Sequence, residues 1–294
     1  MTHANLDRLA SCRCIIQLNH ASAPKGRTSL KRKGIQLTDE LETYIDALQR
    51  SATCWNYEER TETYTFDFFV DESVREAFAY FFESAINLYR GFHKLALLND
   101  LVVSKKVRER LKREAVERRF ASRLPEPPDE DKVFRFEQVR LHRHNADANS
   151  KPVDYVSLSD GEHQQAEIFG IFSMVTEANA LFVLDEPESH FNPQWRVEFV
   201  KRLRDLPPKD RGSQEVLLTS HAPFVPSDMS REQVLIFEKS NGTVKVRRPD
   251  IETYGATFDR ILAHCFDVHP PISQLARDDI DDLMRNGSAD DIRE

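Results

Sequence analysis

The alternation of apolar and polar residues along the chain predicts a mixture of short strands and amphipathic helices. Alternation with a period of two predicts a half-exposed strand, as at 132–141, whereas apolar residues that recur every three or four positions predict a helix, as at 38–50. Strands are expected at 63–70, 132–141, 180–184, 216–219, 233–239 and 243–247, the last two as a hairpin. Helices are expected at 38–50, 72–98, 105–123, 163–178 and 258–266, with a short one from 277.

Two of the expected strands, 180–184 and 216–219, are continuous apolar runs rather than alternating ones. Such runs indicate strands that are buried on both faces of a parallel sheet. The first run is followed by Asp185 and Glu186, and the second is followed within two residues by His221. Because ligands of parallel sheets bind outside the carboxyl ends of the strands, these three residues are candidates for chemistry.

The adjacent acids Asp185 and Glu186 suit a site that binds phosphate groups. One acid can hold Mg²⁺, usually through water, and the other can orient and deprotonate an attacking water. His221 can contact a terminal phosphate. The alternatives are a strand that ends in two solvated acids and a histidine with a structural role.

A further candidate is the start of the helix that follows Ser159. Ser159 is a good N-cap, and Glu162 lies three residues later, as in a capping box. Gly161 allows close approach of the backbone. The free N–H groups of a helix N-terminus bind anions, so this segment offers an anion site. The alternative is a well-capped helix and nothing more.

Together, the three segments resemble the second half of an ATP-binding-cassette (ABC) ATPase. The letters LSDGE at 158–162 are similar to the signature motif LSGGQ, and LFVLDE at 181–186 resembles the Walker B motif with its catalytic glutamate. The letters TSH at 219–221 resemble the switch-histidine loop. Asp160 departs from the signature motif, which has glycine at that position.

The residues of these motifs are most similar to those of soluble ABC ATPases of the DNA-repair and defence type. DEPESHFNP and TSHAPFVPSDM resemble the AAA-family ATPases found beside restriction systems and the related overcoming-lysogenisation-defect ATPases. The resemblance covers 132–282, about half the chain. It implies an α/β fold, namely the C-terminal lobe of an ABC-type P-loop NTPase with a mainly parallel sheet, plus a helical insertion.

The resemblance also implies ATP and Mg²⁺ as ligands. Asp185 would hold Mg²⁺ through water, Glu186 would be the general base, and His221 would contact the γ-phosphate. Ser159, with the backbone at Gly161, would clamp the γ-phosphate of ATP bound to the opposite subunit. We therefore expect a homodimer, or a pair with an ATPase partner subunit, that drives a nuclease or other effector in a restriction-associated or anti-phage system.

The phosphate loop of such ATPases, G-x-x-x-x-G-K-[ST], does not occur in the sequence. Residues 25–29 contain Lys, Gly, Thr and Ser, but not in the order that this loop requires. The chain is interpreted first as a truncated or split copy, with a loop supplied by a partner or a degenerate ATPase as alternatives. The missing loop also supports a second function, that of a non-catalytic partial ATPase or scaffold subunit.

The residues from Lys105 to Arg123 form a basic segment, in which nine Lys and Arg accompany three Glu. Clustered cations neutralise phosphates, so a DNA- or RNA-facing arm is one interpretation and a solvated helix face is the other. A DNA-binding module is accordingly a third possible function. We expect domains at 1–70 (a remnant of the first ATPase lobe), 71–125 (the helical insertion with this arm) and 126–294 (the ATPase lobe), with a Pro-rich boundary at 124–128.

Composition narrows these possibilities only slightly. The net charge of −8, from 41 basic and 49 acidic residues, argues against a wholesale nucleic-acid coat but permits a local basic patch. No apolar run reaches the length of a membrane span, and the start lacks a signal-peptide pattern, so a cytoplasmic protein is expected. Four scattered cysteines suggest no disulfide framework, and Cys12 and Cys14 match no common zinc spacing.

Overall fold

The computed structural model describes residues 6–19, 35–117, 126–144, 150–206, 214–240, 242–269 and 271–286. The chain divides into two compact units, Met1–Val175 and Thr176–Glu294, which are described one at a time. The basic loop expected around 25–29, the end of the basic segment at 118–123 and the start of the Pro-rich boundary at 124–125 lie outside the described residues.

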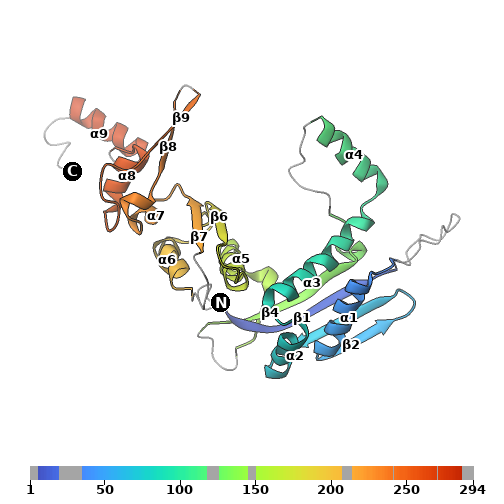
Figure 1. The fold of residues 1–294 in the computed structure, drawn as a ribbon. Helices are drawn as coiled ribbons and strands as arrows, with labels where there is room; N and C mark the ends of the chain where they lie inside the picture. Colours follow the sequence, from blue (N-terminus) through green and yellow to red (C-terminus); the bar gives the residue numbers. More distant parts are fainter. Residues whose placement is uncertain are drawn as a thin grey trace. The chain divides into compact units, whose positions relative to one another are not determined.

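The first unit is built on a five-stranded antiparallel sheet (Figure 1). Its strands are β1 (Leu6–Gln17), β2 (Cys54–Glu58), β3 (Thr63–Phe69), β4 (Phe134–Arg143) and β5 (Val153–Asp154), in the order β2-β3-β1-β4-β5. Helices α1 (Asp39–Ser51), α2 (Glu72–Phe82) and α3 (Ala85–Leu97) pack on one face of this sheet. The strand expected at 63–70 and the helix expected at 38–50 are confirmed.

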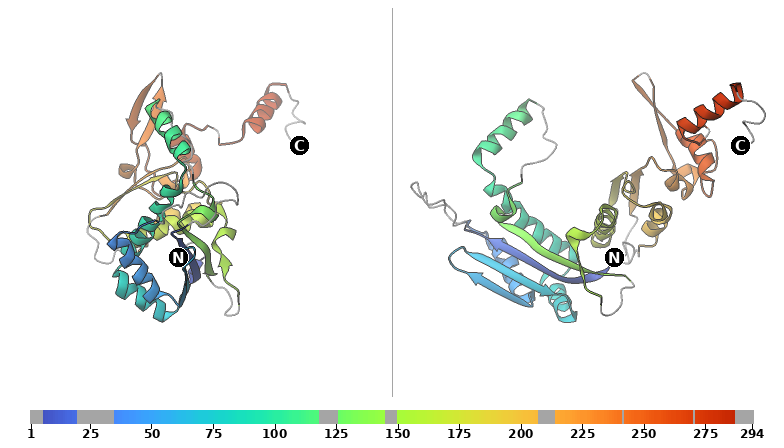
Figure 2. Two further views of the ribbon diagram at one scale, coloured as in Figure 1. Left: turned by 90° about the vertical axis from the view of Figure 1, so that its right-hand side faces the viewer. Right: turned by 180° about the vertical axis from the view of Figure 1, so that it is seen from behind.

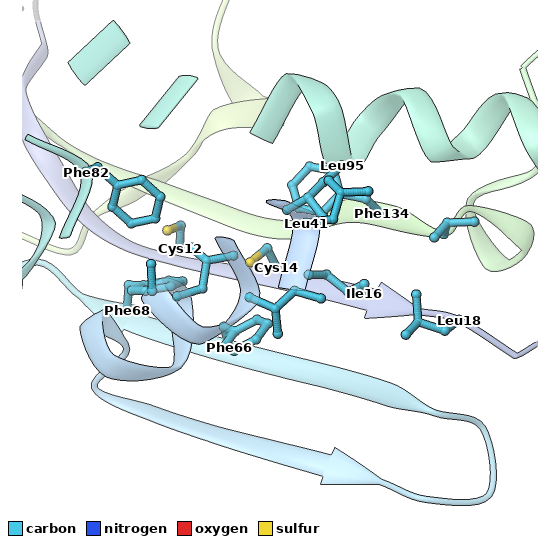
Figure 3. Close-up of a cluster of buried hydrophobic side chains, with 14 of the residues drawn as sticks. Cys12, Cys14, Ile16, Leu18, Leu41, Phe66, Phe68, Phe82, Leu95 and Phe134 are labelled. Carbon is cyan, nitrogen blue, oxygen red and sulfur yellow. The ribbon is translucent and has the colours of Figure 1, made fainter. Parts of the chain in front are cut away.

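The core of this unit lies between the sheet and the three helices (Figure 3). Alternate residues of β3 point in opposite directions, so Phe66 and Phe68 are fully buried while Phe69 is 60% exposed. On β1, Cys12 and Cys14 face the same core, and burial raises the pKa of Cys12 to about 12. These two cysteines are therefore core residues, and no group of three metal-ligating side chains occurs among the described residues.

The region expected to form one helix at 72–98 is two helices. At Glu83 the backbone is left-handed, with φ of +63°, and this ends α2. The hydroxyl of Ser84 then accepts a hydrogen bond of 3.3 Å from the backbone N–H of Asn87 and starts α3. The apolar spacing continued through this break, which is why periodicity alone did not reveal it.

The basic segment begins as helix α4 (Lys105–Val116), after a short 3₁₀ helix, η2 (Leu98–Val102). None of the residues of α4 is buried. Asn99, in η2, donates from its amide nitrogen to the carbonyl of Phe134 and accepts from the N–H of Phe134, at 2.9 Å each. One side chain therefore fastens the chain just before α4 to the start of strand β4, beyond it.

The first unit ends in helix α5 (Asp160–Met174). Two further 3₁₀ turns, η3 (Asp129–Asp131) and η4 (Tyr155–Ser157), precede β4 and α5. The helix expected at 163–178 is thus confirmed, with a start three residues earlier. Its first turn carries the capping box predicted for Ser159 and Glu162.

The second unit begins with a β–α–β segment. Strand β6 (Leu181–Asp185) pairs in parallel with β7 (Glu215–Thr219), and helix α6 (Pro193–Arg204) lies between them in sequence. The rest comprises α7 (Phe224–Ser227), η5 (Arg231–Gln233), the hairpin β8 (Ile236–Ser240) and β9 (Thr243–Arg247), α8 (Phe258–Phe266) and α9 (Gln274–Asn286) (Figure 2). The hairpin expected at 233–247 is confirmed.

The expected mainly parallel sheet is not confirmed, although the mixed α/β character is. In the part of the chain that is described, the largest sheet is antiparallel, and the parallel pairing is that of β6 with β7. Burial of both faces of these strands is also not observed, because Phe182 is 8% exposed but Val183 is 67% exposed. None of the described helices is long and apolar enough to cross a membrane.

Candidate functional site

The carboxyl ends of β6 and β7 bring together three of the residues singled out from the sequence. Asp185 is the register partner of Thr219, so the last residues of the two strands lie side by side. The Thr219 hydroxyl donates a hydrogen bond to Oδ1 of Asp185. Glu186 and His221 follow directly, and the His221 Nε2 lies 3.3 Å from the Glu186 Oε1.

The backbone at Glu186 is held in an unusual conformation. Its φ is +44°, in the left-handed region, which costs a residue with a side chain on the order of 1–3 kcal/mol. The N–H of Glu186 donates to the carbonyl oxygen of Thr219 at 3.1 Å and lies 3.2 Å from the Thr219 hydroxyl oxygen. These bonds offset the strain. They turn the glutamate side chain toward His221, where both side chains are open to solvent.

A buried acid, Glu188, connects this site to the turn that follows it. Glu188 is 3% exposed and accepts a hydrogen bond from the hydroxyl of Ser220 through Oε1, while its Oε2 is buried and has no partner within the described chain. The Ser220 oxygen accepts in turn from the N–H of Ala222 at 3.0 Å. Glu188 therefore holds Ser220, and Ser220 in turn holds Ala222, on the two sides of His221.

Sequence reasoning missed Thr219 and Glu188. Two hydroxyl residues, Thr219 and Ser220, stand at the end of the second strand, opposite the acids at the end of the first. Parallel strands place residues at their ends side by side, so the hydroxyl residues at the end of the second strand could have indicated partners for the acids. The role of Glu188 had no comparable signal, because its burial depends on how the turn folds back.

The residues that follow the acids serve local structure. Asn192 caps α6 by accepting a 2.9 Å hydrogen bond from the N–H of Trp195. Phe191 is buried, and its ring meets those of Trp195 and Phe199 edge-on. Ser189 accepts through its carbonyl from the Arg196 guanidinium at 3.0 Å.

Ser159 and Gly161, the other predicted site residues, belong to the first unit. The Ser159 hydroxyl accepts from the N–H of Glu162 at 3.4 Å and lies 3.0 Å from Glu162 Oε2, which also accepts from the Ser159 N–H at 3.0 Å. Arg143 forms an ion pair with the same carboxylate. Burial alone would raise the pKa of Glu162, but the hydrogen bonds from Arg143 and Ser159 outweigh it and lower that pKa.

Replacement of Glu162 by glutamine is expected to destabilise the protein by about 2 kcal/mol at neutral pH, because Arg143 loses a partially buried partner. The folded-state pKa of Glu162 is lowered, so its contribution is present above the unfolded pKa and is lost as the pH falls through the folded pKa. Urea unfolding at pH 7 and in acid measures this. The matched control is Glu167→Gln on the exposed side of the same helix, and an equal loss in both variants would contradict the prediction.

The arrangement at β6 and β7 can perform one kind of chemistry. A carboxylate beside a histidine can accept a proton from water, and a neighbouring carboxylate can bind a hard cation. The carboxylates of Asp185 and Glu186 and the ring of His221 lie at or just after the ends of the strands and are exposed.

Comparison with known proteins identifies a family for most of the chain. Residues 32–228, about two thirds of the chain, match the family described as "AAA domain, putative AbiEii toxin, Type IV TA system". A stretch of 92 residues, 31% of the chain, is 30% identical to protein ea59 of Escherichia phage lambda. That match spans 17% of the phage protein's length.

Proposed function

Because the chain belongs to this AbiEii-type family of AAA domains, we propose that it is an ABC-type ATPase subunit related to the restriction-associated and overcoming-lysogenisation-defect ATPases. It binds and hydrolyses ATP and acts as a nucleotide-driven switch for an effector in a defence system. The observation that carries the proposal is the meeting of Asp185, Glu186 and His221 at the ends of two parallel strands.

The residues present suit Mg²⁺. Asp185 uses Oδ1 for Thr219, which orients the carboxylate and leaves Oδ2 for a cation. One carboxylate is typical of a Mg²⁺ site in which water and substrate phosphates supply the other ligands. When bound, Mg²⁺ neutralises charge on the phosphate oxygens.

Glu186 is the proposed general base. Its carboxylate is about half exposed and can accept a proton from a water beside the phosphate. His221, at 3.3 Å, restrains that carboxylate and can donate to a phosphate oxygen. The backbone bonds from Glu186 to Thr219 keep the base in place, because they connect the ends of both strands.

The proposed switch joins two copies, or this chain and an ATPase partner subunit. Ser159 and the backbone at Gly161 clamp the γ-phosphate of ATP bound to the opposite subunit. The Ser159 hydroxyl is 3.0 Å from Glu162 in the capping box, so nucleotide binding requires it to exchange that partner for phosphate. This exchange couples the clamp to the presence of the γ-phosphate, and a nuclease is the effector class proposed to respond.

The absent phosphate loop favours a second candidate, a non-catalytic partial ATPase or scaffold subunit. Titration of the purified chain with ATP, with and without Mg²⁺, separates the two. We expect Mg²⁺-dependent binding that Asp185→Asn weakens at least about tenfold, since the cation loses its carboxylate. The control Asp259→Asn, at an exposed position of α8, should bind as the wild type does. Absence of ATP binding by the wild type would favour the scaffold.

A further inference from the structure

Helix α4 presents a dense set of cations that the ATPase proposal does not use. Between Lys105 and Val116 it carries six Lys and Arg and two Glu. The two acids pair within the helix, Lys105 with Glu109 and Arg110 with Glu114, at 3.7 Å each. Four cations have no carboxylate within ion-pair distance in the part of the chain that the structure describes: Lys106, Arg108, Lys112 and Arg113.

The cations of α4 occupy one side of the helix. With about 100° per residue, the six of them lie within an arc of roughly 200°, which also contains Glu109 and Val116. Val107 and Leu111 lie on the remaining side, and both are partly buried, whereas every cation is exposed. The helix therefore has an inner apolar edge and a broad basic surface turned to solvent. Figure 1 shows α4 standing clear of α1 and α2.

The charges at the start of α4 are the reverse of those that an isolated helix favours there. Lys105, Lys106 and Arg108 occupy the start, where the helix dipole is positive, and acids are absent from the first turn. Ser104, at the N-cap, forms no side-chain hydrogen bond to the helix. These charges destabilise the start of the helix, and an anion bound at this end would offset that effect.

We propose that the basic surface of α4, defined by Lys106, Arg108, Lys112 and Arg113, binds the phosphate backbone of a double-stranded nucleic acid. Clustered, unpaired cations are complementary to closely spaced phosphates. The helix has no aromatic residue that could stack on unpaired bases, which disfavours a single strand. It also has no aromatic residue that could anchor it at a lipid surface. This inference does not depend on nucleotide hydrolysis.

The test measures binding of the full chain to a fluorescent DNA duplex of about 30 base pairs. The salt concentration is varied from about 50 to 200 mM, because phosphate contacts weaken over this range. The wild type is expected to show a plot of log K against log salt with a slope of about −3 to −5, since roughly four cations contact phosphate. Replacement of these four surface residues by glutamine should weaken binding at least about 100-fold and flatten the slope.

The matched control neutralises four exposed cations elsewhere, Arg50, Arg75, Lys239 and Lys245, and gives the same net charge. It should bind nearly as the wild type does, and equal weakening would overturn the assignment to α4. Duplex RNA of the same length distinguishes the two nucleic acids, and binding of either supports the proposal. Binding to vesicles containing phosphatidylserine, with none to either duplex, would overturn it. Circular dichroism confirms that each variant is folded.

Discussion

Replacement of Glu186 by glutamine is expected to reduce ATP turnover about 10²–10⁴-fold, the usual contribution of a positioned general base. Glutamine has the same shape but cannot accept a proton at neutral pH. ATP binding should change little, because Asp185 and Thr219 keep their hydrogen bond. Steady-state phosphate release, measured together with nucleotide binding, reports both quantities.

The control for this substitution is Glu215→Gln. Glu215 is exposed and begins β7, at the opposite end of the strand pair from Glu186. It should leave turnover unchanged. A Glu186→Gln chain that hydrolyses ATP as fast as the wild type would remove Glu186 from the role of base. A wild-type chain that binds ATP without turnover would contradict the proposed hydrolysis.

Replacement of Phe66 by alanine is expected to lower the free energy of unfolding of the first unit by about 3–5 kcal/mol. The Phe66 ring is fully buried and stacks near those of Tyr64 and Phe68 on the same strand. Its removal leaves a cavity between β3 and the helices that rigid neighbouring rings cannot fill. Urea or thermal unfolding, followed by circular dichroism, measures the loss.

Phe69→Ala on the same strand is the matched control. Phe69 points away from the helices and is 60% exposed, so its replacement should cost less than about 1 kcal/mol. Similar losses for both variants would contradict the orientation of β3. The pair therefore tests the strand's register as well as its burial.

The parts of the fold that could be predicted from the sequence are those determined by neighbouring residues. Helix α1 begins at the Thr38 cap, and the Ser159 capping box starts α5, because each depends on residues within one turn. The ends of β6 and β7 were also located, since each is a short apolar run that ends in polar residues. The roles of those polar residues in ATP chemistry stay predictions.

The parts that could not be predicted depend on distant pairing. Strand β1 extends over Leu6–Gln17, but the sequence contains a continuous apolar run only near the end of that range. Exposed polar residues such as Arg13 interrupt the apolar pattern before it. Arg13 is satisfied by Asp67 on β3 and Glu137 on β4, which are far away in sequence. Glu188 is a similar case, because its partner Ser220 follows strand β7 and is 32 residues away in sequence.

The two hydrogen bonds between Asn99 and Phe134 join the two ends of the chain segment that contains α4. The sheet and its helices are held together on both sides of that junction, so this segment contributes little to the core, and none of the residues of α4 is buried. We therefore expect that the arm, with its proposed nucleic-acid surface, can be lengthened, replaced or removed without redesign of the sheet and helices that carry it.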